Sequence, residues 1–170
     1  PLALLRTAFN FVQLLDALEE QGLRFQLPRG SRVMETGGYK GRTRALPQGE
    51  LHRWMWDRLG VPDSHVVCEY GMSELSSQAY DHAIAGGPRP ERSARRVFQF
   101  PPWARALLVS PETGRPVAEG ETGLIRVVDL ANVWSCLAVQ TEDLGIRRGD
   151  GFELAGRAPR SEPRGCSLQT

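Results

Sequence analysis

The sequence predicts an α/β fold in which a mostly parallel sheet flanked by helices is followed by a smaller antiparallel β subdomain. Over residues 1–85, amphipathic helical patterns alternate with short, almost continuously apolar runs, as in parallel sheets covered by helices. After the loop-like stretch GGPRPERSARR (86–96), the remaining segments have the lengths and turns of antiparallel strands. We therefore expect an α/β portion over 1–85, a β-rich subdomain over 86–156 and a hinge or C-terminal tail over 157–170.

Two helices are expected in the α/β portion. Apolar residues recur at steps of three and four across Leu2–Gln21, and Gly22 is placed to end that helix. A second helix fits Gln48–Leu59, with Pro47 near its start and Gly60 just beyond its end.

Short apolar strands are expected in both portions of the chain. In the α/β portion they fall at Ser31–Glu35 and His65–Glu69. In the β-rich subdomain they are expected at Ala104–Ser110, Thr122–Asp129, Val133–Val139 and Gly151–Arg157. Ligands of parallel sheets collect at the carboxyl ends of the strands, where the pairs Gly37-Gly38 and Tyr70-Gly71 lie.

The composition excludes several classes of protein. With 21 basic and 20 acidic residues, the chain lacks the charge of a general nucleic-acid binder. No apolar run reaches the length of about 18 residues that a membrane span requires, and no signal peptide is recognisable, so a reducing cytoplasm is the default compartment. Cys68, Cys136 and Cys166 form no C-x-x-C pair and have no histidine at zinc-finger spacing, which argues against a disulfide framework or a structural metal.

The segment VCEYGMSEL (67–75) ends an apolar run in groups suited to a nucleotide. Tyr70 offers a ring on which a base can stack, for about 1–3 kcal/mol. Ser73 offers a hydroxyl to a phosphate oxygen, and Glu74 offers a hard oxygen ligand to Mg²⁺. The alternative is a simple turn in which Tyr70 packs into the core.

Two further groups of residues suggest ligand contacts. The adjacent glycines of TGGYKGR (36–42) allow a ligand to approach the backbone closely, although ordinary turns use the same residues and the spacing is not that of a P-loop. Asp143, in TED (141–143), can accept both hydroxyls of a ribose, and Arg157 can reach sugar or phosphate. Asp143 and Arg157 could instead form a surface ion pair.

These motifs occur in the order of the adenylate-forming superfamily: a glycine pair, Y-G-x-[TS]-E, T-x-D and then G-R. The resemblance is closer to LuxE-type acyl-protein synthetases, the fatty-acid-activating components of bacterial bioluminescence systems, and to their relatives. Four segments carry it: METGGYKGR, EYGMSELSSQAYD, TEDLG and GRAPRSEPRGCSL.

The resemblance implies that a carboxylic acid, such as a fatty acid, attacks the α-phosphate of ATP to give acyl-AMP and pyrophosphate, and that the acyl group then passes to a thiol. It places the adenine at Gly37, Gly38, Tyr70 and Gly71. It assigns Ser73 to the α-phosphate, Glu74 to Mg²⁺, and Asp143 to the ribose hydroxyls with Arg157 beside it.

Cys166 resembles the acyl-accepting cysteine near the C-terminus of the bioluminescence synthetases. Arg160 and Arg164 would favour its thiolate, which is the nucleophilic form. A small residue in a hinge or strand is the alternative interpretation, and Cys68 and Cys136 are expected to be inert core thiols. The resemblance also allows an acyl-acceptor protein, such as a reductase, as a partner.

The sequence departs from the superfamily at Ser73, where threonine is usual, and at Glu142, where glycine is usual and where we expect an altered turn. Neither a hydroxyl-rich phosphate loop nor a C-terminal domain with a catalytic lysine is recognisable. The chain therefore resembles the latter half of an enzyme, and we expect it to be inactive alone. Two alternatives stay open: an acyl- or aryl-CoA ligase of the phenylacetate-CoA ligase type, and a non-catalytic nucleotide-binding module.

Overall fold

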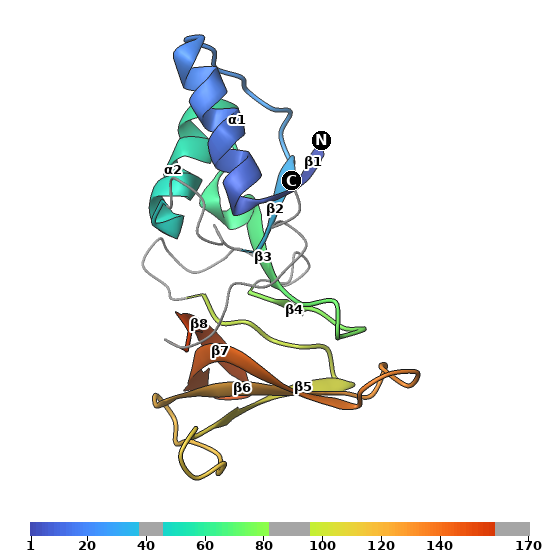
Figure 1. The fold of residues 1–170 in the computed structure, drawn as a ribbon. Helices are drawn as coiled ribbons and strands as arrows, with labels where there is room; N and C mark the ends of the chain where they lie inside the picture. Colours follow the sequence, from blue (N-terminus) through green and yellow to red (C-terminus); the bar gives the residue numbers. More distant parts are fainter. Residues whose placement is uncertain (38–45, 82–95, 159–170) are drawn as a thin grey trace. The chain divides into compact units, whose positions relative to one another are not determined.

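The computed structural model describes residues 1–37, 46–81 and 96–158, which fall into two compact units (Figure 1). Among these residues, unit 1 contains 1–37 and 46–69, and unit 2 contains 70–81 and 96–158. The boundary expected between residues 85 and 86 lies outside the described residues, as does most of the tail expected over 157–170. The three-part division therefore stays a prediction.

Unit 1 is a parallel sheet with helices, as the sequence predicts. Its elements are β1 (Ala3–Thr7), α1 (Ala8–Glu20), β2 (Arg32–Thr36), α2 (Gln48–Leu59), the 3₁₀ turn η1 (Asp63–His65) and β3 (Val66–Tyr70), whose last residue belongs to unit 2. Strand β1 pairs with β2, and β2 pairs with β3, both in parallel. The sheet therefore brings the ends of β2 and β3 side by side, with Thr36 opposite Glu69.

The core of unit 1 joins both helices to the sheet. The apolar stripe of α1 and the buried face of α2 pack against Val33 of β2 and Val66 of β3. Leu15 of α1 and Met55 of α2 are completely buried. Burying one such side chain contributes about 1.5–3 kcal/mol, so this hydrophobic core supplies a large share of the stability of unit 1.

The first predicted helix is wrong over its first turn and a half. Ala3–Thr7 form strand β1, and the helix begins only at Ala8. The Thr7 hydroxyl accepts a hydrogen bond from the Asn10 amide at 3.2 Å, which marks Thr7 as the N-cap. Short apolar runs fit a strand as well as a helix, and here pairing with β2 decides between them.

The second predicted helix is confirmed from Gln48 to Leu59. Gly60 ends it in the left-handed region, at φ 68°, and its amide donates to the Trp56 carbonyl at 3.0 Å. The two predicted strands of unit 1 are confirmed with a shift of one residue, as β2 and β3.

We expect Gly60→Ala to destabilise the protein by about 1–2 kcal/mol, because a side chain in the left-handed region is strained. The added Cβ would also lie 2.4 Å from the Gln26 side chain, which would have to move. Thermal and chemical unfolding of the two proteins, compared under the same conditions, would measure the loss.

Gly49→Ala, in the same helix, is the matched control. Gly49 has no positive φ, and nothing lies within 4 Å of the position of its Cβ. We expect this variant to be at least as stable as the parent, since alanine has a higher helix propensity than glycine. Equal losses in the two variants would contradict the explanation by backbone strain.

Unit 2 is built on an antiparallel sheet, again as predicted. Its elements are β4 (Ala79–Tyr80), β5 (Ala104–Val109), β6 (Thr122–Asp129), β7 (Ala138–Arg148) and β8 (Gly151–Arg157). The sheet has the order β5-β6-β7-β8 (Figure 1). Tyr80 of β4 makes an antiparallel bridge with Gln99.

The strand predicted at Val133–Val139 is wrong except for its last two residues. Residues 130–137 form a turn, and β7 begins at Ala138 and continues through Asp143 to Arg148. In the turn, Asn132 donates from Nδ2 to the Cys136 carbonyl at 2.9 Å, while Trp134 is 98% exposed. The apolar pattern therefore misled the prediction, because these apolar side chains are not in a sheet.

No helix among the described residues is long and apolar enough to cross a bilayer.

Candidate active site

Three of the predicted site residues meet in unit 2. Tyr70 ends β3, Asp143 lies within β7, and Arg157 ends β8. The Tyr70 hydroxyl donates to Oδ2 of Asp143 at 2.9 Å, and Nε of Arg157 donates to Oδ1 at 2.9 Å. Asp143 and Arg157 are opposite each other in the register of β7 and β8, so the sheet itself sets their contact.

The ring of Tyr70 is 7% exposed and lies in an aromatic cluster. It makes edge-on contacts with Phe98, Phe100 and Phe152, the last with ring centroids 5.2 Å apart. Burial, and then the charge of Asp143 and the hydrogen bond to it, raise the pKa of Tyr70 well above its usual value, so the phenol stays a neutral donor. Stacking of adenine on Tyr70 stays a prediction, and it requires part of this ring to be uncovered.

Asp143 keeps acceptor capacity beyond these two bonds. A carboxylate has about four lone-pair positions, and the bonds from Tyr70 and Arg157 occupy two of them. The Asp143 side chain is 15% exposed, so solvent or a ligand can reach the rest. Two donors already fixed around the carboxylate hold it in one orientation.

Thr141 explains how the T-x-D segment positions Asp143. The buried Thr141 hydroxyl donates to the Ile125 carbonyl on β6 at 2.7 Å and accepts from the Asp143 amide at 3.1 Å. The altered turn expected at Glu142 is wrong, because all three residues lie within β7. Glu142 is exposed there, so a strand at this point has no need of glycine.

Ser73, Glu74 and Gly71 form an exposed loop in unit 2. The Ser73 hydroxyl donates to Oε2 of Glu74 at 3.2 Å, while the Glu74 carbonyl accepts from Nδ2 of Asn132 at 2.7 Å. The backbone of Glu74 is thus tethered and its carboxylate is open. Such a carboxylate fits the single acidic ligand that Mg²⁺ commonly takes beside substrate phosphates.

Asp129 is a buried anchor for this loop that the sequence reasoning missed. It has no exposed surface, and it accepts from the amides of Ser76, Ser77 and Ala131 at 2.8–3.0 Å and from the Ser77 hydroxyl at 2.8 Å. Burial alone would raise the pKa of Asp129, but these hydrogen bonds outweigh it, and the pKa lies below its usual value. The pair Ser76-Ser77, just after YGMSE, was the available sequence signal for such an anchor, because its amides and hydroxyls need an acceptor.

We expect Asp129→Asn to destabilise the full-length protein by about 2–4 kcal/mol at neutral pH, because an amide presents an NH₂ group to amides that need an acceptor. The depressed pKa means that the stabilisation from Asp129 is present above the unfolded pKa of about 4 and is lost as the pH falls through the lower folded pKa. The difference in free energy of unfolding between the parent and Asp129→Asn, measured as a function of pH, should narrow below about pH 4.

The control for this prediction is Asp150→Asn, which changes an exposed carboxylate in the same unit. It should unfold like the parent at neutral pH, since an exposed ion pair contributes little. An Asp129→Asn protein as stable as the parent at neutral pH would contradict the anchoring role.

The remaining predicted residues are placed apart from this group or are not described. Gly37 is in unit 1, directly after β2, exposed and at φ 64°. Beside it, the Thr36 hydroxyl donates to the Glu69 carboxylate, which joins the ends of β2 and β3. Gly38 and Cys166 lie outside the described residues.

Comparison with known proteins identifies the family. The family model described as "Acyl-protein synthetase, LuxE" matches residues 1–170. The chain belongs to the LuxE acyl-protein synthetase family.

Curated relatives agree with this assignment. The chain is 34% identical to a long-chain-fatty-acid–luciferin-component ligase of Aliivibrio fischeri and 24% identical to one of Vibrio harveyi. Each alignment covers 93% of the chain and 42% of the relative. This LuxE-family chain therefore spans less than half the length of the relatives that it matches.

Solved structures show the same fold. An ATP-bound RpMatB-BxBclM chimera has a TM-score of 0.63 at 19% identity, over 92% of this chain and 31% of the other. The McyG A-PCP protein complexed with phenylalanyl-adenylate has a TM-score of 0.63 at 16% identity, over 93% and 30%. The LuxE-family chain thus has the fold of part of an adenylate-forming domain.

Proposed function

We propose that the protein containing this chain activates a carboxylic acid, with a fatty acid as the leading candidate, by forming an acyl-adenylate from ATP, and that it then transfers the acyl group to a cysteine thiol. The contact of Tyr70, Asp143 and Arg157 carries the proposal. These residues come from three motifs that follow one another in the order typical of adenylate-forming enzymes, and their side chains contact one another although they are far apart in sequence. Membership of the LuxE family supports it.

Asp143 suits a nucleoside because of its orientation and remaining lone pairs. Tyr70 and Arg157 hold the carboxylate, which leaves it able to accept hydrogen bonds from two neighbouring hydroxyls of a ribose. Arg157 is partly exposed and keeps a positive charge near the sugar and phosphates. The Tyr70 phenol keeps its proton, so it orients Asp143 without adding a second negative charge.

Ser73 and Glu74 suit the phosphate end. Their loop is tethered through Asn132 and Asp129, so the hydroxyl and the carboxylate are presented from an anchored backbone. When bound, Mg²⁺ would neutralise charge on the phosphates and so lower the repulsion against an attacking carboxylate. Glu74 would be its protein ligand, and Ser73 would donate to a phosphate oxygen.

We expect Asp143→Ala in the full-length enzyme to lower acid-dependent exchange of pyrophosphate into ATP by about 100-fold or more, because the nucleotide loses its positioning carboxylate. Glu74→Ala should lower the exchange as well, and added Mg²⁺ should restore it only in part. Asp150→Asn, which changes an exposed carboxylate in the turn between β7 and β8, should leave exchange unchanged.

Exchange that is undiminished when Glu74→Ala and Asp143→Ala are combined would contradict the assignment of these residues. Tight ATP binding by the full-length protein without any exchange would instead favour a non-catalytic nucleotide-binding module.

The acyl acceptor is the second part of the proposal. We expect Cys166→Ser to abolish hydroxylamine-labile acylation of the full-length protein by labelled fatty acid and ATP, while pyrophosphate exchange persists, because the thiol acts only after the adenylate has formed. Acylation would be followed on denaturing gels with and without hydroxylamine.

Cys136→Ser is the matched control, because Cys136 is an exposed cysteine of unit 2 and not the core thiol expected from the sequence. It should keep full acylation. Formation of a CoA thioester by the Cys166→Ser protein at the parent rate would place the enzyme with the CoA ligases instead.

A further inference from the structure

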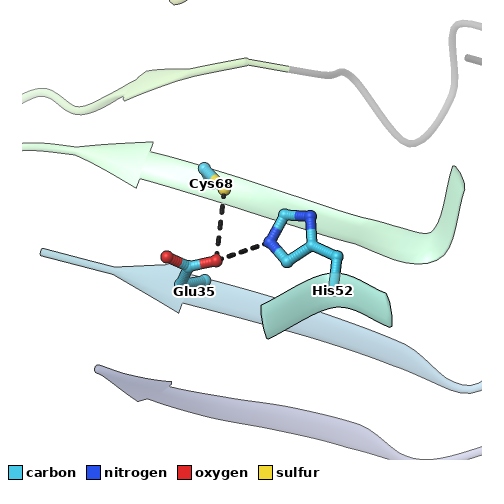
Figure 2. A group of neighbouring side chains, drawn as sticks. All are labelled: Glu35, His52 and Cys68. Carbon is cyan, nitrogen blue, oxygen red and sulfur yellow. Dashed lines mark hydrogen bonds and ion pairs between the residues drawn. The ribbon is translucent and has the colours of Figure 1, made fainter. Parts of the chain in front are cut away.

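Three buried side chains with different donor atoms meet in unit 1. They are Glu35 of β2, His52 of α2 and Cys68 of β3 (Figure 2). Their exposed fractions are 7%, 4% and 3%. Oε2 of Glu35 lies 2.7 Å from Nε2 of His52 and 3.6 Å from Sγ of Cys68. The three donor atoms all lie within 4.8 Å of one another.

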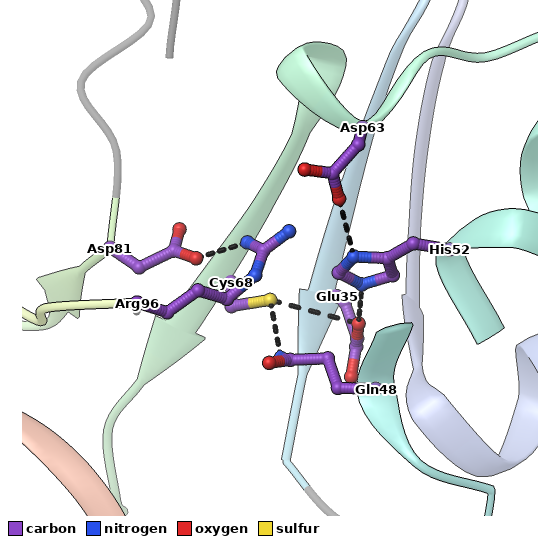
Figure 3. Close-up of polar contacts among 7 residues, drawn as sticks. All are labelled: Glu35, Gln48, His52, Asp63, Cys68, Asp81 and Arg96. Atoms are coloured by element: carbon purple, nitrogen blue, oxygen red, sulfur yellow. Dashed lines mark hydrogen bonds and ion pairs between the residues drawn. The ribbon is translucent and has the colours of Figure 1, made fainter. Parts of the chain in front are cut away.

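The other face of the imidazole has a partner of its own. Nδ1 of His52 lies 2.8 Å from Oδ1 of Asp63, in the turn after α2 (Figure 3). A carboxylate bonded to the second ring nitrogen is the usual outer partner of a histidine that binds a metal, because it fixes the tautomer and the orientation of the ring. Asp63 is thus an observation independent of the three donors.

We propose that Glu35, His52 and Cys68 bind one divalent transition-metal ion of the zinc class. Bond lengths near 2.0 Å to nitrogen and oxygen and 2.3 Å to sulfur place tetrahedral donors about 3.3 Å (O to N) and about 3.5 Å (O to S) apart. The oxygen–sulfur separation of 3.6 Å already matches. The oxygen–nitrogen separation of 2.7 Å would have to widen by about half an ångström on binding, and the nitrogen–sulfur separation lies within 4.8 Å.

The charges of the cluster favour a cation. Both ring nitrogens of His52 face carboxylate oxygens, Nε2 that of Glu35 and Nδ1 that of Asp63. On binding, Nε2 and Sγ give their protons to the solvent and their lone pairs to the ion, while Nδ1 keeps its proton for Asp63. The two charges of the ion then balance the Glu35 carboxylate and the Cys68 thiolate.

The donor set separates this site from the Mg²⁺ expected at Glu74. A thiolate, an imidazole and one carboxylate suit Zn²⁺ or Co²⁺, whereas Mg²⁺ requires oxygen donors. Three protein donors leave one tetrahedral position for a water or another small donor. The Gln48 side chain lies next to the cluster, with Nε2 at 3.0 Å from Sγ of Cys68.

An ion in this cluster would connect one helix and two strands of unit 1. Glu35 immediately precedes Thr36 and Gly37, and Cys68 immediately precedes Glu69 and Tyr70. An ion held there would join α2 to the last residues of β2 and β3. It would thereby fix the strand ends from which the predicted nucleotide-binding residues follow.

The test uses the full-length enzyme stripped of metal and titrated with Zn²⁺ alone, and with Co²⁺ as a spectroscopic probe. We expect one site for each chain, a thiolate-to-cobalt charge-transfer band, and a melting temperature that rises with Zn²⁺ but not with Mg²⁺. Cys68→Ser and His52→Gln should each weaken Zn²⁺ binding by at least 100-fold. Asp63→Asn should weaken it by about 10- to 100-fold through the orientation of the ring.

Matched controls keep the result interpretable. Cys136→Ser, Cys166→Ser and His65→Gln should retain the stoichiometry and the cobalt band, and circular dichroism should show which variants fold. Where a variant does not fold, the parent protein decides. If the parent shows neither a cobalt–thiolate band nor a Zn²⁺-dependent rise in melting temperature, the proposal is overturned. A band that survives in folded Cys68→Ser, or disappears in Cys136→Ser or Cys166→Ser, would overturn it as well. None of these readouts depends on acyl activation, so failure here leaves the proposed function standing.

Discussion

A carboxylate removed from water must be met by donors or by a cation, and this constraint organises the polar interior of both units. Asp129 is surrounded by three amides and a hydroxyl, Asp143 by a phenol and a guanidinium, and Glu35 by an imidazole. Most of these donors come from segments distant in sequence, whereas the Ala131 amide lies two residues from Asp129. The buried anions therefore act as fixed points that hold loops and strand ends in defined positions.

In unit 2 the two aspartates have different tasks because their surroundings differ. Asp129 has no exposed surface and its bonds go to the backbone near Ser76 and Ser77, so it stabilises a loop. Asp143 is reachable from solvent and has lone pairs to spare, so it can bind a ligand. The aromatic cluster around Tyr70 supports this division, because it packs around the ring whose hydroxyl donates to Asp143.

In unit 1 the same constraint produces a mixed cluster. The His52 ring lies between the carboxylates of Glu35 and Asp63. Sγ of Cys68 contacts the Glu35 carboxylate. A protonated imidazole satisfies the two carboxylates, and a divalent ion satisfies a carboxylate and a thiolate together. Either state joins α2 to β2 and β3, but only the ion makes that connection dependent on metal supply. The family assignment concerns acyl activation and is neutral between these states.

The sequence by itself determined the α/β order, helix α2 and strand β6, because periodicity and glycine caps are local signals, and it singled out Tyr70, Asp143 and Arg157 as candidates through their motifs. That these three side chains contact one another is decided by the tertiary structure. Only the tertiary structure decided that Ala3–Thr7 pair with β2 and that residues 130–137 form a turn, since a short apolar run takes its conformation from its partners. The spacing of the cysteines argued against a metal, yet Glu35, His52 and Cys68 meet across two strands and a helix. Local spacing cannot report such a cluster, because the parallel crossover between β2 and β3 sets its geometry.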